Sequence, residues 1–462
     1  MVVRLLPSAR HAVPLAALAT LHLACSGDDS GGAGGSTGAP RLTDSAAATA
    51  REACEFKSGA MPVETLGRSD RLGKDIPVEH VFVMMMENRS FDHYFMKLPE
   101  YGQPDVKVAP ATYTNPDTAG SPVSWFHTSE YCVEDPDHGW EGSHVQFGDG
   151  KNDGFVVTND PDGARALGYL DQTDLPFYYE LANTYAISDS YFCSLLGPTW
   201  PNRMYLYAGS SYGLTKNSLP VAGDSPSVYS AMIEKGLEWR VYRSNLAPAA
   251  MFINTWIDSI AGCQDPELGP CRVADISTLY ADLASGNLPP LVFIEPEYNS
   301  GITETSEHPP GNPHHGQHLA WSVVDALGKS PVWSKSALFL TYDEHGGFAD
   351  HVPPPPACHP GNGSPDDTSH GDFDRLGFRV PVFVISPFAK QHFVSHEVHS
   401  HTSILRFIQA KFELPALTGR DANSDAMMDF FDFDSPPFTT PPPFAEPPVD
   451  AAKVARCEEL FP

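Results

Sequence analysis

Two clusters of oxygen-bearing side chains follow apolar segments of this sequence. Glu87 and Asn88 come directly after one such segment, and Asp343 and Glu344 follow another. Carboxylate and amide oxygens suit divalent metals at phosphate sites. Two adjacent buried acids also repel each other unless a cation or a proton lies between them. The four side chains are therefore candidate metal ligands; the alternatives are a helix cap at Asn88 or Ser90 and an exposed turn at the second pair.

A threonine lies between two prolines in the segment Gly-Pro-Thr-Trp-Pro-Asn-Arg, which begins at Gly197. The hydroxyl of Thr199 is a candidate nucleophile, and the nearby Asn202 and Arg203 could bind the phosphate that it attacks. A metal on the threonine oxygen would favour loss of its proton. The alternative is a proline-rich turn with a structural arginine.

Some of the 19 histidines lie in polar loops, several of them beside proline or tryptophan. A single histidine is usually structural or exposed to solvent, but in such loops it is a candidate general acid or phosphate donor. The candidates are His138, His144, His308 and His401.

Short apolar runs alternate with helical patterns along the chain. We expect strands over Val78 to Met86, Leu291 to Ile294, Ala337 to Thr341 and Val380 to Ile385. We expect helices over Phe177 to Tyr185, His318 to Leu327 and Thr402 to Phe412. The alternation predicts an α/β fold with a mainly parallel central sheet flanked by helices. Ligands bind at the carboxyl ends of the strands in such sheets, so the two acidic clusters would meet at one edge.

The overall charge argues against a nucleic-acid partner. The chain has 29 Lys and Arg against 58 Asp and Glu, a net charge of −29, which repels a phosphodiester backbone. The plainest meaning of that charge is solubility. An anionic substrate would need a local cation, and a bound metal supplies one.

The N-terminus has the pattern of an export signal. Arg4 and Arg10 precede an apolar stretch from Ala12 to Ala24, which predicts a signal peptide over residues 1–25. The sequence around Cys25 resembles a lipoprotein processing site, so membrane attachment through a lipidated Cys25 and ordinary cleavage both stay open. We expect an exported protein: a periplasmic, outer-membrane or cell-surface lipoprotein, or a secreted enzyme. Residues 26–53 are expected to form a flexible Gly/Ser-rich tether, and residues 54–462 one catalytic domain.

Eight cysteines in an exported chain suggest disulfides. Cys263 and Cys271 could close a short loop, and Cys54 and Cys457 could join the two ends of the mature chain. Cys193 lies in an apolar run, where a buried inert thiol is expected.

Taken together, these segments resemble the bacterial phosphoesterase family that contains phosphatidylcholine-type, non-haemolytic phospholipases C and an acid phosphatase. The matching blocks occur in family order, and each alone is weak. They are Glu87–Phe95, Asp137–Phe155, Gly197–Arg203, His308–Pro310, Tyr342–Phe348, Arg379–Pro381, Ile385–Pro387 and His401–Ser403.

The resemblance implies an alkaline-phosphatase-like fold and a covalent phospho-enzyme. By matching position, Thr199 would attack phosphorus, and His138 and His308 would bind phosphate or protonate the leaving alcohol. The metal, which could be zinc, calcium, manganese or iron, would be held by Glu87, Asn88, Asp343 and Glu344. Trp200 and Met96 depart from the family pattern, which leaves substrate preference open.

Three functions compete at this point. The first is a phospholipase C type phosphodiesterase acting on a phospholipid or a small phosphate ester. The second is an acid phosphatase on the same scaffold. The third is a non-catalytic surface lipoprotein, against which the intact acidic pairs argue, because buried charges are costly to keep without a use.

Overall fold

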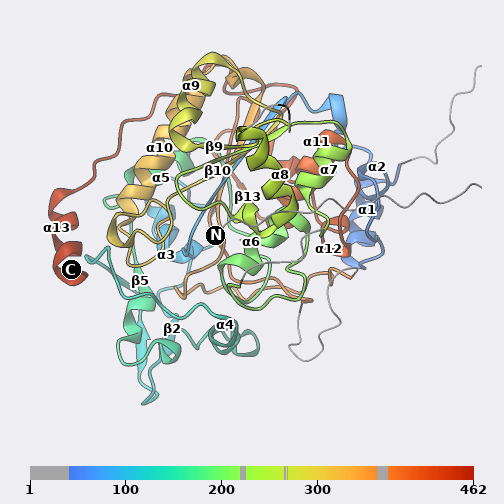
Figure 1. Ribbon diagram of the computed structural model, residues 1–462. Helices are drawn as coiled ribbons and strands as arrows, with labels where there is room; N and C mark the ends of the chain where they lie inside the picture. Colours follow the sequence, from blue (N-terminus) through green and yellow to red (C-terminus); the bar gives the residue numbers. More distant parts are fainter. Residues whose placement is uncertain (1–40, 219–224, 265–266, 268, 362–372) are drawn as a thin grey trace, which may run out of the picture. The chain divides into compact units, whose positions relative to one another are not determined.

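The computed structural model describes residues 41–218, 225–264, 267, 269–361 and 373–462, and residues 41–462 form one compact unit. Among these residues an eight-stranded sheet occupies the centre (Figure 1). Every described strand of this sheet runs in one direction except β12, which is antiparallel to both neighbours. The predicted α/β class with a mainly parallel sheet is confirmed. In spatial order the strands are β13 (Phe393–Ser395), β6 (Ala186–Ser188), β12 (Val382–Ile385), β11 (Ser336–Tyr342), β1 (His80–Met86), β10 (Leu291–Glu295), β8 (Trp239–Arg243) and β9 (Val273–Asp275).

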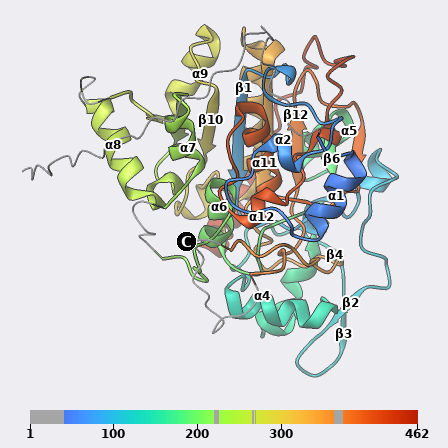
Figure 2. The ribbon, with the colours of Figure 1, turned by 90° about the vertical axis from the view of Figure 1, so that its right-hand side faces the viewer.

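Helices cover both faces of this sheet (Figures 1 and 2). One group is α5 (Pro176–Thr184), α9 (Ile276–Ser285) and α10 (Pro313–Lys329), in which α10 packs against the other two. The other group is α6 (Thr199–Ala208), α7 (Val228–Glu234), α11 (His401–Phe412) and α12 (Gly419–Ala422), in which α6 packs against α7 and α11. A further helix, α8 (Ile253–Gln264), contacts β9. The central strands are buried on both faces, which explains their continuous apolar sequences.

The predicted elements occur with small shifts of their ends. The largest shift is in α10, which begins at Pro313 rather than at His318. The side chain of Asn312 caps this helix by accepting a hydrogen bond from the backbone N–H of His314, and proline is favoured at the first helical position. The strand predicted from Val380 begins at Val382, directly after a proline that has no N–H to donate.

A set of small elements lies beside the main sheet, at the bottom of Figure 1. Two short ladders pair β2 with β3 and β4 with β5, and a helix, α4, lies between β4 and β5 along the chain. Their bounds are β2 (Thr114–Pro116), β3 (Pro122–Ser124), β4 (Phe126–His127), α4 (Trp140–Phe147) and β5 (Gly168–Tyr169). This part of the chain carries two of the candidate histidines and lines two cavities.

The predictions for the N-terminus have different outcomes. The signal peptide, Cys25 and the first part of the tether lie outside the described residues. The rest of the predicted tether is wrong, because Asp44–Glu52 forms helix α1. Thr43 caps this helix, Ala47 and Ala50 are buried, and the carboxylate of Asp44 accepts a hydrogen bond from the backbone of Ser69. Among the described residues, no helix is both long and apolar enough to cross a membrane.

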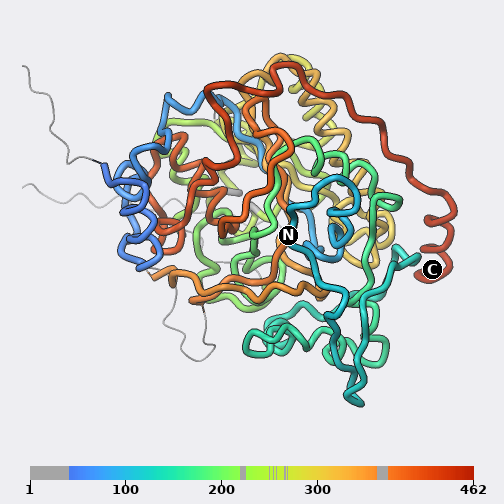
Figure 3. Tube along the Cα trace, turned by 180° about the vertical axis from the view of Figure 1, so that it is seen from behind, coloured from blue at the N-terminus to red at the C-terminus, as the bar shows by residue number. Residues whose placement is uncertain are grey.

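Three disulfides join described residues: Cys54–Cys358, Cys132–Cys457 and Cys263–Cys271. The short-loop pair was predicted, and Cys193 is a buried free thiol, as expected. The predicted pairing of Cys54 with Cys457 is wrong. Figures 1 and 3 show α1 and the C-terminal helix α13 (Ala451–Leu460) on opposite sides, so that each cysteine pairs with a nearer partner.

We predict that the Cys132–Cys457 disulfide stabilises the fold more than the Cys263–Cys271 disulfide. The first pair is 325 residues apart and the second only 8. On the chain-entropy account, this difference in loop length corresponds to about 3 kcal/mol in the free energy of unfolding. Urea denaturation of the two double cysteine-to-serine variants should therefore show the larger loss in C132S/C457S. Equal losses would contradict this expectation.

Candidate active site

The two acidic clusters meet because their strands are neighbours. β1 and β11 run parallel with Met86 beside Tyr342, so the residues after each strand leave the sheet at the same place. The backbone N–H of Asn88 donates to Oδ1 of Asp343 at 3.1 Å, and the N–H of Asp343 donates to the Met86 carbonyl at 3.1 Å. The predicted convergence at one sheet edge is confirmed.

A tight turn places Glu344 against the same loop. Its carboxylate accepts a hydrogen bond from the backbone N–H of Gly346 at 2.7 Å. Gly346 has a φ of 64°, and a Cβ there would lie 2.2 Å from the carbonyl oxygen of Asn88, so only glycine fits. Asp343 and Glu344 are fully buried, which removes the alternative of an exposed turn. The cap of the next helix, α3 (Phe91–Phe95), is Ser90 rather than Asn88.

Arg203 is the cation that faces the buried acids. Its guanidinium lies 3.1 Å from Asp343, 3.4 Å from Glu295 and 3.5 Å from Glu87, and it also donates to the carbonyls of Met85 and Met86. The side chain is fully buried. One positive charge therefore faces three carboxylates.

The electrostatics of this cluster favour an additional cation. Burial raises the pKa of Asp343 to about 6 and that of Glu87 well above its usual range, although Arg203 opposes both shifts. Burial likewise raises the pKa of Glu344. Oδ1 of Asn88 and Oε1 of Glu344 are buried and have no hydrogen-bond partner among the described residues. Two unpartnered oxygens beside excess negative charge are the donor set that a divalent metal would satisfy.

Thr199 is the first residue of helix α6 and is 3% exposed. Residues four apart lie on the same face of a helix, so Thr199 faces the same way as Arg203, whose guanidinium contacts Asp343. The hydroxyl and the helix N-terminus therefore lie together on the acidic side of α6.

The contacts of Asn202 and Arg203 lie within the protein, and their role in substrate binding stays a prediction. The Asn202 side chain accepts from the backbone of Ser194 and Leu195 and donates to the carbonyl of Gly197 at 2.8 Å. It is fully buried and holds the loop that precedes Thr199. Arg203 is likewise fully engaged with acids and carbonyls. The sequence shows that polar side chains lie near the threonine. It does not show that these side chains already form hydrogen bonds with backbone groups.

His138 and His308 face each other across the cluster, with ring centroids 5.6 Å apart. Nε2 of His138 lies 3.2 Å from the amide nitrogen of Asn88 and 3.9 Å from Oε1 of Glu344. Burial acts to lower the pKa of His138, but the carboxylates of Glu344 and Asp135 outweigh it and raise the pKa to about 9. Asp135 lies between the two rings, 3.5 Å from His138 and 3.7 Å from His308.

The other two histidines have structural contacts. His401 is fully buried; its Nε2 donates to the Asp343 carbonyl at 2.7 Å, and its Nδ1 accepts from the hydroxyl of Tyr191 at 2.9 Å. Burial lowers its pKa to about 4, so the ring is neutral and positions Asp343, and its role in substrate binding stays a prediction. His144 donates from Nδ1 to the carbonyl of Trp140 on α4, and no contact joins it to the acidic cluster within the described part of the chain.

Sequence reasoning missed two residues of this site. Glu295 is the last residue of β10, the strand on the other side of β1, and it binds Arg203 and the hydroxyls of Tyr207 and Tyr298. The rule that identified Glu87 also applies to Glu295, because it comes directly after the predicted strand ending at Ile294. Asp135 had no such signal. Its role depends on a loop that brings Asp135 and the nearby His138 against His308, which is distant in sequence.

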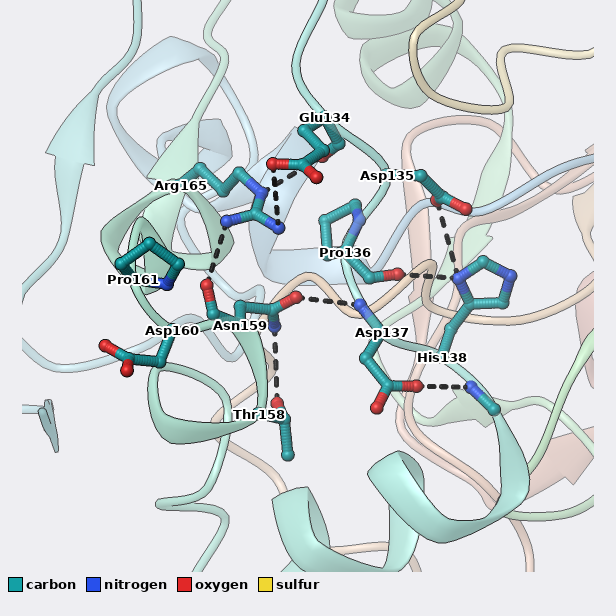
Figure 4. A pocket seen from close by; sticks show the side chains of 11 residues that line it. Glu134, Asp135, Pro136, Asp137, His138, Thr158, Asn159, Asp160, Pro161 and Arg165 are labelled. Atoms are coloured by element: carbon teal, nitrogen blue, oxygen red, sulfur yellow. Dashed lines mark hydrogen bonds and ion pairs between the residues drawn. The ribbon is translucent and has the colours of Figure 1, made fainter. Parts of the chain in front are cut away.

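A cavity of about 320 Å³ opens beside His138, and we call it the acidic cavity (Figure 4). Arg165 crosses one side of it and donates to the carbonyls of Glu134 and Asn159. The lining includes the acidic residues Glu134, Asp135, Asp137 and Asp160. Asp135 and His138 belong both to this lining and to the site, so a ligand in the cavity would contact the site at these two residues.

The solved structures that match this chain have low TM-scores and low sequence identity to it. One is a protein of the alkaline phosphatase superfamily from Vibrio parahaemolyticus, with a TM-score of 0.39 and 8% identity, covering 84% of this chain and 78% of that one. Another is the lipoteichoic acid synthase LtaP from Listeria monocytogenes, with a TM-score of 0.40 and 10% identity, covering 82% of both chains.

Sequence relatives are much closer. The chain is 32% identical to phospholipase C B of Mycobacterium tuberculosis over 475 residues, 89% of each protein. It is 31% identical to a non-hemolytic phospholipase C of Burkholderia pseudomallei over 412 residues, 74% of this chain and 56% of that one. The Phosphoesterase family matches residues 78–415, which include every residue of this site. The chain therefore belongs to the Phosphoesterase family and is a hydrolase of phosphoric ester bonds.

Proposed function

We propose that this protein is an exported, metal-dependent phosphoesterase of the phospholipase C type that works through a phosphothreonine intermediate. The carrying observation is the pair of unpartnered buried oxygens, Asn88 Oδ1 and Glu344 Oε1, in the acidic cluster faced by α6. The relatives named phospholipase C support the substrate class.

The metal would be held by Glu87, Asn88, Asp343 and Glu344, with Arg203 keeping two of these carboxylates in place. When bound, it would favour the alkoxide form of the threonine and stabilise negative charge on the phosphate oxygens. Zinc, calcium, manganese and iron all remain candidates, because the donors are oxygens with histidine nearby.

Thr199 would form the bond to phosphorus while the bond from phosphorus to the leaving alcohol breaks. The backbone N–H of Thr199, at the N-terminus of α6, suits a phosphate oxygen. His138, with Asp135 and His308 beside it, could pass a proton to the departing alcohol. Water would then hydrolyse the phosphothreonine and release the phosphorylated head group.

Export and an oxidising compartment fit the three disulfides among the described residues. The predicted signal peptide over residues 1–25 supports the same proposal. A lipidated Cys25 would hold the enzyme at a membrane surface, close to phospholipid substrates.

A substrate panel tests the type of ester. We expect a higher kcat/KM for a phosphocholine diester than for p-nitrophenyl phosphate, measured across pH. A preference for the monoester would instead identify an acid phosphatase. Hydrolysis of neither ester, in protein loaded with each of the four candidate metals, would contradict both assignments.

We predict that Thr199→Ala abolishes turnover while leaving metal content unchanged. The substitution removes the attacking oxygen but none of the proposed ligands. By analogy with the loss of other catalytic nucleophiles, kcat should fall by about a thousandfold or more. Thr278→Ala, at an exposed position on α9, is the matched control and should behave as wild type. Full activity of the Thr199 variant would remove this residue from the mechanism.

A second prediction concerns the metal itself. Treatment with a chelator should abolish hydrolysis, and one divalent metal should restore it. Glu344→Gln removes a proposed anionic ligand and should weaken metal affinity by about tenfold or more, on the scale of altered metal-site contacts. Elemental analysis after dialysis would measure this loss, with the exposed Glu234→Gln on α7 as control. Wild-type metal content in the Glu344 variant would exclude it from the ligand set.

A further inference from the structure

A second cavity, of about 180 Å³, shares Arg165 with the acidic cavity, and we call it the apolar cavity. Most of its lining is hydrocarbon, and Phe126, on β4, is 41% exposed. The apolar lining residues are Phe126, Tyr131, Val133, Ala164, Leu170 and Phe348. Such a lining favours an apolar group rather than a phosphate or a sugar.

A buried arginine also lines the apolar cavity. Arg89 is 1% exposed and donates to the carbonyls of Glu307 and Gly311 and to the ring of His93. Its Nε has no hydrogen-bond partner among the described residues, and its charge faces the buried carboxylates of Glu304 and Glu307, whose pKa values burial raises and this charge lowers. A ligand with an acceptor oxygen beside an apolar body would complement both features.

Neighbouring residues of one segment of chain line the two cavities. Residues 130, 131 and 133 line the apolar cavity, residues 134–139 line the acidic cavity, and Arg165 lines both. The segment is fixed at one point by the Cys132–Cys457 disulfide and at another by the hydrogen bond from Arg165 to the Glu134 carbonyl. A ligand that follows this segment from His138 would pass from the lining of the acidic cavity to that of the apolar cavity.

The apolar cavity is also attached to the active site. Arg89 comes directly after the proposed ligand Asn88, and its backbone N–H donates to the Glu344 carbonyl at 3.1 Å. Its guanidinium binds the carbonyl of Glu307, the residue before His308. Phe348 lies in the turn after Glu344 and packs under the guanidinium at 4.9 Å.

We propose that the apolar cavity binds an acyl chain of the leaving alcohol, with an ester carbonyl oxygen directed toward Arg89. This inference rests on the proposed function and extends it: the enzyme distinguishes phosphate esters by the apolar part of the alcohol. Each methylene that leaves water on binding adds about fourfold to affinity, so a short buried segment of chain has a measurable effect.

The test fills the cavity. Ala164 lines it and is partly exposed, so Ala164→Trp occupies the space with little disturbance of the core. The matched control is Ala119→Trp in the exposed turn between β2 and β3. Two phosphocholine esters are compared: dihexanoyl phosphatidylcholine below its micelle concentration, and p-nitrophenyl phosphocholine, which has no acyl chain.

We expect Ala164→Trp to lower kcat/KM for the dihexanoyl ester by about tenfold or more, because two or more methylenes would no longer be buried. The kcat/KM for the aryl ester should stay within about twofold of the wild-type value. Ala119→Trp should change neither. Equal losses on both esters, or no loss on either, would overturn the proposal.

Calorimetry separates this inference from the proposed function. If the wild type hydrolyses neither ester, the proposed function fails, and binding of dihexanoyl phosphatidylcholine still tests the cavity. Binding that Ala164→Trp weakens and Ala119→Trp does not would support it. Equal binding by all three proteins, or no binding, would overturn it. Hexanoate binding that depends on Ala164, without phospholipid binding, would identify a free fatty acid as the occupant and overturn it as well.

Discussion

The site depends on one buried guanidinium. Arg203 lies within 3.5 Å of Glu87, Asp343 and Glu295, which come from the ends of three adjacent parallel strands. Burying such charges is costly, and removing the arginine would leave three carboxylates without compensation. The same residue is one helical turn from Thr199, so the interaction that holds the acids together also fixes the start of α6 against them.

The charge balance of this cluster links structure to chemistry. A single arginine leaves the buried carboxylates with excess negative charge, and the unpartnered oxygens of Asn88 and Glu344 lie in the same loops. A divalent cation would both balance the excess negative charge and coordinate the two unpartnered oxygens. Two neighbouring side chains already form hydrogen bonds within the protein: Asn202 with the backbone and His401 with the Asp343 carbonyl. In the proposed mechanism the phosphate would contact Thr199, the N-terminus of α6 and the pair of histidines.

Sequence reasoning succeeded for residues at strand ends and failed where a loop decides the contacts. Glu87 and Asp343 could be paired in advance because parallel strands deliver the residues after them to one edge, and Glu295 obeys the same rule. Arg203 and His401 were predicted to bind substrate, and the type of side chain alone does not reveal their contacts with acids and carbonyls inside the protein. Asp135 and the pairing of Cys54 depend on contacts between loops distant in sequence, which carry no periodic pattern.

The claim that a threonine hydroxyl attacks phosphorus is tested most directly by trapping the intermediate. The metal-loaded enzyme would be mixed with a phosphocholine ester, quenched in acid during turnover, and digested for peptide mass spectrometry. The account predicts a phosphorylated peptide whose modified residue is Thr199, and its absence when substrate is omitted. A phosphoryl group on a different residue, or none during measured steady-state hydrolysis, would contradict it.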